Sequence, residues 1–281
     1  MSMLSIALLT NPESGSGDAD EVAGRLRALG AGTSVYALGE VEAALAQGPD
    51  RIAVAGGDGS LACVAAPAGR AGVPVAVIPT GTANDFARAL GLPRDPAAAS
   101  ELAVLGTRTR SLDLAWMDER PFLNVASLGL PPAAAKHASG LKAMLGSFAY
   151  GIGALRAGLR AKPVSCVVHS DGEELFAGAA WQVTVACSGA FGAGSSIGAD
   201  EADGRLDAVI LEAGSRARLA LHAYGMRGGD LATQSGVRKV RCSAAEVELA
   251  RPALFNVDGE LVESGSCAFR VERHAVSVVV P

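Results

Sequence analysis

The segment Gly56-Gly57-Asp58-Gly59-Ser60 combines glycines with an acid and a hydroxyl directly after the apolar run Arg51–Ala55. Glycines let backbone N–H groups come close to phosphate oxygens, and the start of a following helix adds free N–H groups. The Asp58 carboxylate cannot bind phosphate directly, because both are anionic, but it can hold Mg²⁺ beside a phosphate. Taken alone, the segment is equally consistent with a tight turn in which Asp58 caps a helix.

Two other loops carry the same kind of side chains at comparable places. Asn11-Pro12-Glu13-Ser14-Gly15-Ser16-Gly17 follows the apolar run Leu4–Leu9, and Thr80-Gly81-Thr82-Ala83-Asn84-Asp85-Phe86 follows the run Pro74–Ile78. Each loop by itself is compatible with an ordinary strand-to-helix turn. Three such loops at the same edge of one sheet favour a phosphate-binding site, and the two acids Asp58 and Asp85 favour a shared magnesium ion.

The elements that must position these loops are short. The first 120 or so residues alternate apolar runs with helical stretches, which predicts a parallel sheet covered on both faces. Ligands of such sheets bind beyond the carboxyl ends of the strands. We therefore expect an N-terminal doubly wound α/β domain over residues 1–121.

From about Phe122 the pattern changes to strand-like runs with few helices between them. Polar and apolar residues alternate in segments such as Glu246–Ala250, which is typical of half-buried antiparallel strands. The expected fold class is α/β plus all-β, with a C-terminal antiparallel β-sandwich over residues 122–281 and an active site in the cleft between the domains. Helical inserts are expected near 141–159 and 216–226. The uncharged stretch 175–199 is expected to be a strand and a glycine-rich loop rather than a membrane helix. The further strands are expected at Val164–His169, Trp181–Cys187, Leu206–Leu211, Val237–Cys242, Cys267–Val271 and Val276–Val280.

Composition narrows the compartment and the partners. The net charge of −5, from 29 acids and 24 bases, disfavours nucleic acid as a partner. Five cysteines without a C-x-x-C spacing favour neither a zinc site nor a disulfide framework, so the reducing cytoplasm is the expected location.

The order of the motifs resembles the catalytic domain of the diacylglycerol kinase family, which includes sphingosine kinases and bacterial lipid kinases. The resemblance covers most of the chain. It rests on the three loops above together with Phe122–Gly129, Asp203-Gly204-Arg205-Leu206-Asp207 and Asn256-Val257-Asp258-Gly259-Glu260. Because Gly-Gly-Asp-Gly also occurs in phosphofructokinases and NAD kinases, the late Asp258-Gly259-Glu260 element favours the lipid kinases. The implied α/β domain is phosphofructokinase- or NAD kinase-like.

The resemblance implies ATP and Mg²⁺ as cofactors. Asp58 and Asp85 would organise the catalytic Mg²⁺. A second, structural Mg²⁺ would bind Asp203 and the backbone carbonyls of Asp200 and Arg205, although a solvated acidic turn explains that segment almost as well. The residues expected to hold ATP are Asn11, Pro12, Ser14, Gly15, Gly56, Gly57, Asp58, Gly59, Ser60, Thr80, Gly81, Thr82 and Asn84.

By the same resemblance, Asp258 and Glu260 would reach the γ-phosphate from the second domain. One of them would take the proton from the acceptor hydroxyl, and the sequence leaves the choice between them open. Asp-Gly is also a strong hairpin signal, and a hairpin turn can itself present carboxylates.

The function expected from these features is an ATP- and Mg²⁺-dependent lipid kinase acting on a hydroxyl of a diacylglycerol-like or related membrane lipid. The alternatives are a kinase of a soluble acceptor, such as NAD or a sugar phosphate, and a non-catalytic nucleotide- or lipid-binding regulator. The basic, apolar stretch 136–162 is a candidate for peripheral contact with the inner membrane face, although packing on the sandwich is the favoured interpretation. A homodimer stays open.

Overall fold

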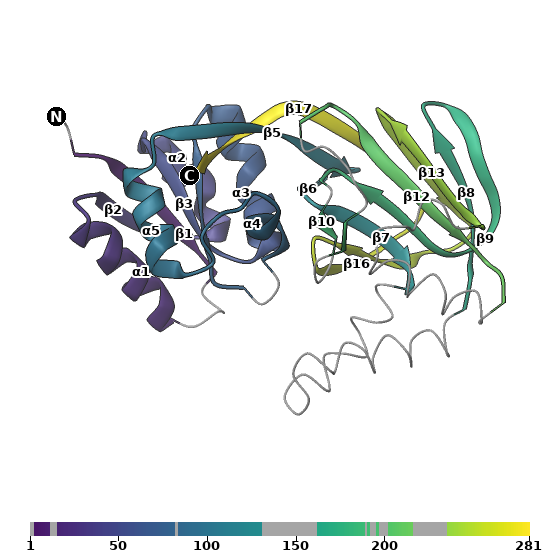
Figure 1. Ribbon diagram of the computed structural model, residues 1–281, viewed down its shortest axis with the longest axis horizontal. Helices are drawn as coiled ribbons and strands as arrows, with labels where there is room; N and C mark the ends of the chain where they lie inside the picture. The colour runs from purple at the N-terminus through teal and green to yellow at the C-terminus, as the bar shows by residue number, and fades with distance from the viewer. Residues whose placement is uncertain are drawn as a thin grey trace.

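The computed structural model describes residues 3–11, 16–81, 84–130, 162–188, 190–191, 195–196, 202–215 and 235–281. They form two lobes joined by a long two-stranded ribbon (Figure 1). The elements of the first lobe are β1 (Ser5–Thr10), α1 (Ser16–Ala28), β2 (Gly32–Ala37), a 3-10 turn (Leu38–Glu40), α2 (Val41–Ala46), β3 (Arg51–Gly56), α3 (Asp58–Ala71), β4 (Val75–Pro79), α4 (Asp85–Ala89) and α5 (Pro96–Leu105).

The first lobe is built on four parallel strands in the order β4-β3-β1-β2. Alternate side chains of β1, β3 and β4 enter two separate cores, one beneath α1 and α5 and the other beneath α2, α3 and α4. Burial on both faces explains why these strands read as nearly continuous apolar runs. The expected doubly wound α/β lobe is confirmed.

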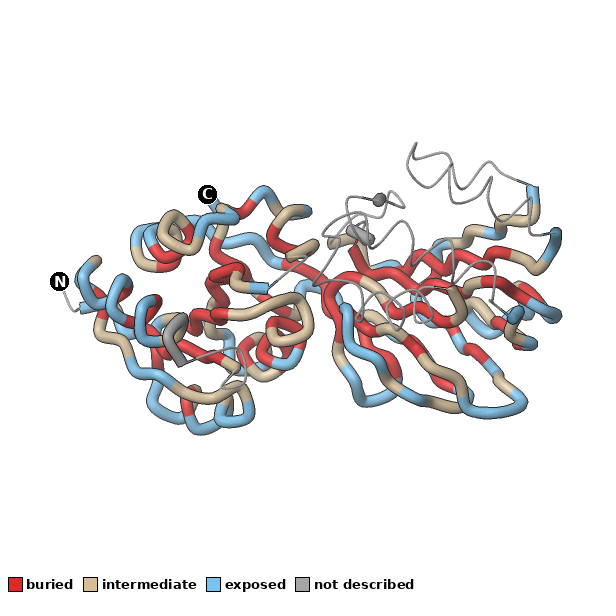
Figure 2. The backbone as a smooth tube through the Cα atoms, turned by 90° about the horizontal axis from the view of Figure 1, so that it is seen from below, coloured by how far each residue is buried: buried red, intermediate tan, exposed pale blue. Residues whose placement is uncertain are grey.

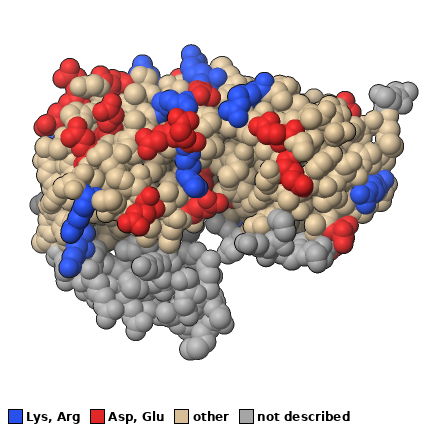
Figure 3. Space-filling view, turned by 180° about the vertical axis from the view of Figure 1, so that it is seen from behind, with Lys and Arg blue, Asp and Glu red and all other residues tan. Residues whose placement is uncertain are grey.

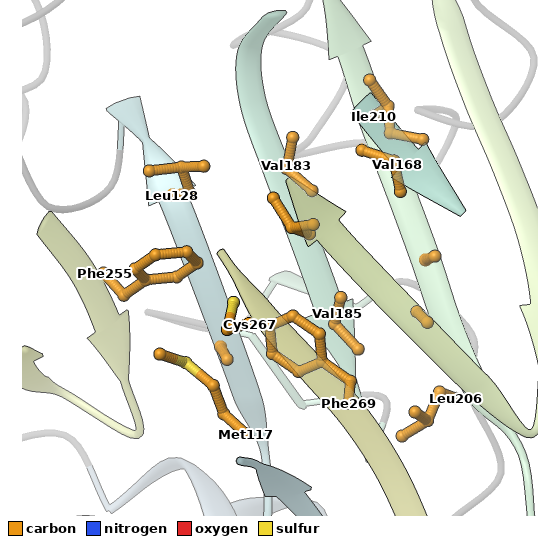
Figure 4. Close-up of a cluster of buried hydrophobic side chains, with 14 of the residues drawn as sticks. Met117, Leu128, Val168, Val183, Val185, Leu206, Ile210, Phe255, Cys267 and Phe269 are labelled. Atoms are coloured by element: carbon orange, nitrogen blue, oxygen red, sulfur yellow. The ribbon is translucent and has the colours of Figure 1, made fainter. Parts of the chain in front are cut away.

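The second lobe is antiparallel and surrounds one large apolar core, with a smaller cluster at Trp181 and Leu211. In Figure 4, side chains from several strands, including Phe255, Phe269 and Leu206, point into this shared interior. The rings of Phe122 and Phe269 meet edge to face at 6.3 Å. The strands are β6 (Arg120–Phe122), β7 (Val125–Gly129), β8 (Val164–Ser170), β9 (Glu173–Ala186), β10 (Ala190–Phe191), β11 (Ser195–Ser196), β12 (Leu206–Glu212), β13 (Val237–Cys242), β14 (Ala244–Leu249), β15 (Ala253–Val257) and β16 (Glu260–Ser264).

The ribbon that joins the lobes consists of β5 (Arg108–Met117) and β17 (Cys267–Val280). One end of β17 pairs with β14 in the second lobe, whereas Val278 pairs with Val75 in the first, so the C-terminus lies in the first lobe (Figure 1). Buried residues continue along this ribbon from one lobe into the other (Figure 2).

The ribbon differs from the sequence expectation in two ways. The two separate strands expected at Cys267–Val271 and Val276–Val280 are one strand with an irregularity between Glu272 and Val276, whose polar residues resemble a loop in sequence. The strand β5 was not expected, because its first four residues are exposed and include two arginines, which hides the apolar second half.

Within the described ranges, no helix is long and apolar enough to cross a membrane. The strand expected at Trp181–Cys187, within the uncharged stretch 175–199, is present as the second half of β9. The helical inserts expected near 141–159 and 216–226 lie outside the described residues.

Candidate active site

Two glycine loops meet at the carboxyl ends of β3 and β4. A Cβ placed on Gly81 would lie 2.7 Å from the Cα of Gly57, and one on Gly56 would lie 2.8 Å from the Cβ of Ser60. Both approaches are closer than Cβ atoms tolerate, so these positions require glycine. The loops therefore form one continuous backbone surface, as the phosphate-binding expectation requires.

Asp58 joins these two loops through its carboxylate. Its Oδ2 accepts the N–H of Asp85 and its Oδ1 accepts the N–H of Phe86, each at 3.0 Å, so Asp58 caps α4. Burial raises the pKa of Asp58, although the two backbone donors act in the opposite direction. Asp85 stands beside it and forms an ion pair with Arg88 of the same helix.

The hairpin of β15 and β16 brings a second pair of acids to the site. Asp258 and Gly259 form its two-residue turn with φ values of 46° and 93°, which is the geometry that the Asp-Gly signal predicts. The Asp258 carboxylate is buried and accepts the backbone N–H groups of Leu123, Asn124 and Val125 at 2.6 to 3.0 Å.

Burial raises the pKa of Asp258 to about 7, against the three N–H donors, and the negative charge of Asp58 adds to the rise. The two aspartates are therefore close enough to interact, although they belong to different lobes. Asp258 combines two properties: it fixes the hairpin on β7, and its charge is sensitive to pH near neutrality.

Glu260 makes the direct contact between the lobes at this site. A Cβ placed on Gly59 would lie 2.7 Å from Oε1 of Glu260, so the side chain rests against the first turn of α3. The other carboxylate oxygen, Oε2, receives a hydrogen bond from Nη1 of Arg120 at 2.8 Å. The structure thus brings Glu260 and the glycine loop together, as expected from the sequence.

Two cavities flank these residues. One, of about 740 Å³, lies between α1, α5 and the loop after β4, and its lining includes Arg25, Thr80, Gly81 and Asn84. The other, of about 450 Å³, lies between α3 and the β15–β16 hairpin. Its lining residues are Gly59, Ala62, Cys63, Met117, Asp118, Glu119, Arg120, Pro121, Val257, Asp258, Glu260, Val262 and Ser264.

The described residues fit a nucleotide and a divalent cation. The Oδ1 atom of Asn84 is buried and has no hydrogen-bond partner among the described residues, while its Nδ2 donates to the carbonyl of Gly81. An orphaned acceptor beside two touching glycines is suited to a ligand that brings a donor and needs close backbone approach. Asp58 keeps lone pairs beyond its two hydrogen bonds, as Mg²⁺ would require.

Asp203 and Arg205, which are expected to hold the second metal, line neither of the two cavities. Asp203 forms an ion pair with Arg241 and accepts the backbone N–H of Arg205 at 2.8 Å, while Asp200 lies outside the described residues. No group of three or more His, Cys, Asp or Glu side chains placed to hold a metal occurs in the described part of the chain. Metal binding at Asp203 and Arg205 stays a prediction.

Some of the other residues expected to contact the nucleotide are described in the structure and some are not. Asn11 follows β1 at the same edge of the sheet as the glycine loops. Four further expected residues lie outside the described ranges: Pro12, Ser14, Gly15 and Thr82.

Sequence reasoning missed Arg120 and Asp113. Asp113 is buried on β5 and accepts the N–H groups of Gly204 at 2.6 Å and His274 at 2.8 Å, so it ties the ribbon to the second lobe. The sequence signal for Asp113 was its place as an acid between two apolar residues, Leu112 and Leu114. Arg120 had none, because its partner Glu260 is 140 residues away in sequence.

On the face seen in Figure 3, acidic side chains of the described residues gather at the upper left, whereas basic and acidic side chains are mixed over the middle of that face.

Comparison with known proteins gives matches along nearly the whole chain. Residues 5–117 match the family model of the diacylglycerol kinase catalytic domain. Residues 124–280 match that of the YegS C-terminal NAD kinase beta sandwich-like domain.

Individual relatives agree with these models. The chain is 34% identical over 252 residues to a protein named "Probable lipid kinase YegS-like" from Pseudomonas aeruginosa, covering 86% of this chain and 80% of that protein. It is 30% identical over 217 residues to the diacylglycerol kinase of Bacillus subtilis, covering 75% and 71%. A solved structure of a diacylglycerol kinase from Bacillus anthracis shares the fold with a TM-score of 0.69 at 18% identity, covering 100% of this chain and 98% of that one.

Proposed function

Because the chain belongs to the diacylglycerol kinase family of lipid kinases, we propose that it transfers the γ-phosphate of ATP, with Mg²⁺, to a hydroxyl of a diacylglycerol-like or related membrane lipid. The observation that carries this proposal is the contact of Glu260, from the second lobe, with Gly59 of the phosphate loop. A carboxylate from one lobe at the phosphate loop of the other is what direct transfer to a bound alcohol needs.

In this proposal the glycine loops hold the phosphates. The backbone of Gly57 and Gly81 and the buried acceptor of Asn84 would bind the nucleotide, and the 740 Å³ cavity beside Thr80 has room for its remaining parts. Asp58 and Asp85 would hold Mg²⁺, which neutralises charge on the phosphate oxygens when bound. Asp58 also fixes the start of α4, so it orders the loop that it serves.

Glu260 is the proposed general base. A free alcohol is a weak nucleophile at pH 7, and a positioned carboxylate can accept its proton as the bond to phosphorus forms. Both oxygens of Asp258 are engaged by three backbone N–H groups, whereas Oε1 of Glu260 faces the loop. Asp258 would then hold the hairpin that carries Glu260.

The 450 Å³ cavity beside Glu260 favours a lipid as the acceptor. Met117, Val257 and Val262 give it apolar walls, while its acids oppose an acceptor that already carries phosphate, such as NAD or a sugar phosphate. The lipid would be met by peripheral contact with the inner membrane face. A cytoplasmic location is supported by five cysteines that form no disulfide.

The experiment is ADP release by the full chain with ATP and Mg²⁺, using vesicles that contain single candidate lipids and, separately, NAD and sugar phosphates. Asp58→Asn should lower the rate roughly 10²-fold or more, because it removes the charge that would hold the metal. Glu212→Gln removes a carboxylate far from the cleft and should leave the rate unchanged. Turnover of a soluble acceptor alone would refute the lipid assignment, and lipid binding without ADP release would identify a regulator instead.

A further inference from the structure

Arg120 lies at the edge of the cleft, where the two residues that follow it fix its backbone. It begins the short strand β6, and the next two residues are Pro121, with a fixed φ, and Phe122, which is fully buried in the core of the second lobe. Its guanidinium therefore starts from a well-defined backbone position. The helix α3, which begins with the phosphate loop, packs against the same strand.

The ion pair of Arg120 with Glu260 does little for stability. The two side chains are 43% and 51% exposed, and exposed pairs of this kind contribute little to folding. Their arrangement is nevertheless specific, because Nη1 of Arg120 engages Oε2 of Glu260 while Oε1 faces Gly59. Arg120 thus holds one oxygen of the carboxylate while the other is turned toward the phosphate loop.

The charges around the cavity strengthen this role. Among the described residues that line the 450 Å³ cavity there are four acids and a single cation, Arg120. Without the guanidinium, Glu260 would face the like charge of its neighbours and would be free to turn toward solvent. The acids are Asp118, Glu119, Asp258 and Glu260.

We propose that Arg120 is a positioning residue for phosphoryl transfer: it holds Oε2 of Glu260 so that Oε1 stays at the phosphate loop in line with the acceptor hydroxyl. The inference rests on the proposed function, in which Glu260 is the base. Arg120 acts through Glu260 and touches neither the acceptor nor the phosphate in this role.

Cys63 provides a reporter that does not depend on activity. It is the exposed cysteine, the other four being buried, and it lies one helical turn beyond Gly59. Burial raises the pKa of the Cys63 thiol, the charge of Glu260 raises it further and the charge of Arg120 lowers it. Its alkylation rate at fixed pH therefore reports whether both charges stand at the cleft.

The kinetic test is a double-mutant cycle on lipid phosphorylation. Arg120→Ala should lower kcat roughly 10- to 100-fold, because a misplaced base loses much of its effect, whereas Arg120→Lys should keep most of the activity. In a Glu260→Gln background, Arg120→Ala should cost less than about 2-fold, since the group it positions is gone. Arg238→Ala, which breaks an ion pair with Glu212 away from the cleft, is the matched control.

Iodoacetamide labelling of Cys63 completes the test. Arg120→Ala should slow labelling and Glu260→Gln should speed it, each by roughly 2- to 5-fold, with Arg238→Ala unchanged. Equal labelling rates in all variants, an unchanged kcat in Arg120→Ala, or the same kcat loss in both backgrounds would each overturn the proposal. If the wild-type chain phosphorylates no lipid, the proposed function fails, and labelling still decides whether Arg120 and Glu260 stand at the loop.

Discussion

Two Asp-Gly turns of the second lobe share one local geometry but have opposite surroundings. Asp171-Gly172 joins β8 to β9 and Asp258-Gly259 joins β15 to β16, with positive φ at all four residues. In each turn the aspartate N–H donates to the backbone carbonyl of the first residue of a neighbouring strand. The aspartate carboxylate accepts the N–H of that same residue. The partner is Ala244 of β14 in one case and Val125 of β7 in the other.

The difference lies in what surrounds the two carboxylates. The side chain of Asp171 is 42% exposed, and the pKa of this acid is lowered by the hydroxyl of Ser243 and by backbone N–H donors. Asp258 accepts three backbone N–H groups, yet burial raises its pKa to about 7. Neighbouring sequence therefore determines the turn, whereas the packing of distant segments determines the chemistry of the acid that the turn presents.

The largest expected effect is the loss of the buried carboxylate. Asp258→Ala leaves the N–H groups of Leu123, Asn124 and Val125 without their acceptor, and each one that stays buried costs about 1–3 kcal/mol. We expect the unfolding free energy in urea to fall by several kcal/mol. Asp171→Ala should lower it much less, because water can replace that carboxylate. Equal losses in the two variants would show that the surroundings do not distinguish the turns.

The features predicted from sequence are those that adjacent residues determine. The glycine loops after β3 and β4 and the Asp258-Gly259 hairpin were all predicted, because glycine, turn residues and apolar periodicity act over a few positions. The parallel order of the first lobe followed from the alternation of strands and helices.

The features that sequence did not reveal depend on distant partners. Asp258 was identified as an acid on a turn, but its burial depends on Leu123–Val125, more than 130 residues earlier. Arg120 needs Glu260 to have a role, and β5 is recognisable only once β17 lies beside it. Such pairings arise when the chain packs, and no local pattern encodes them.

The contributions of Asp258 and Asp171 to the free energy of unfolding should change with pH in opposite directions. The folded-state pKa of Asp258, about 7, exceeds the unfolded value of about 3.9, so the folded protein holds a proton that the unfolded chain releases in this interval. Relative to Asp258→Asn, wild-type stability should therefore fall as pH rises from about 4 to 7, by on the order of 1 kcal/mol per pH unit.

Asp171 should show the opposite dependence. Because its pKa is lowered in the folded state, its contribution is present above the unfolded pKa and is lost as the pH falls below about 4. Urea unfolding of wild type, Asp258→Asn and Asp171→Asn between pH 3 and 8 measures both contributions. A flat difference between wild type and Asp258→Asn from pH 4 to 7 would mean that the three N–H donors outweigh burial.

The smallest expected difference concerns the glycines of the two turns. Gly172 and Gly259 have φ values of 86° and 93°, and a Cβ on either would meet no atom within 4 Å. Alanine should therefore cost only the backbone strain of positive φ, about 1–2 kcal/mol at each site, and the two losses should agree within roughly 0.5 kcal/mol. Urea midpoints compare them directly. If the two glycine variants lose equal stability while the two aspartate variants do not, the difference between the turns lies in the carboxylates. A larger loss of stability in Gly259→Ala would instead place part of that difference in the backbone of the cleft hairpin.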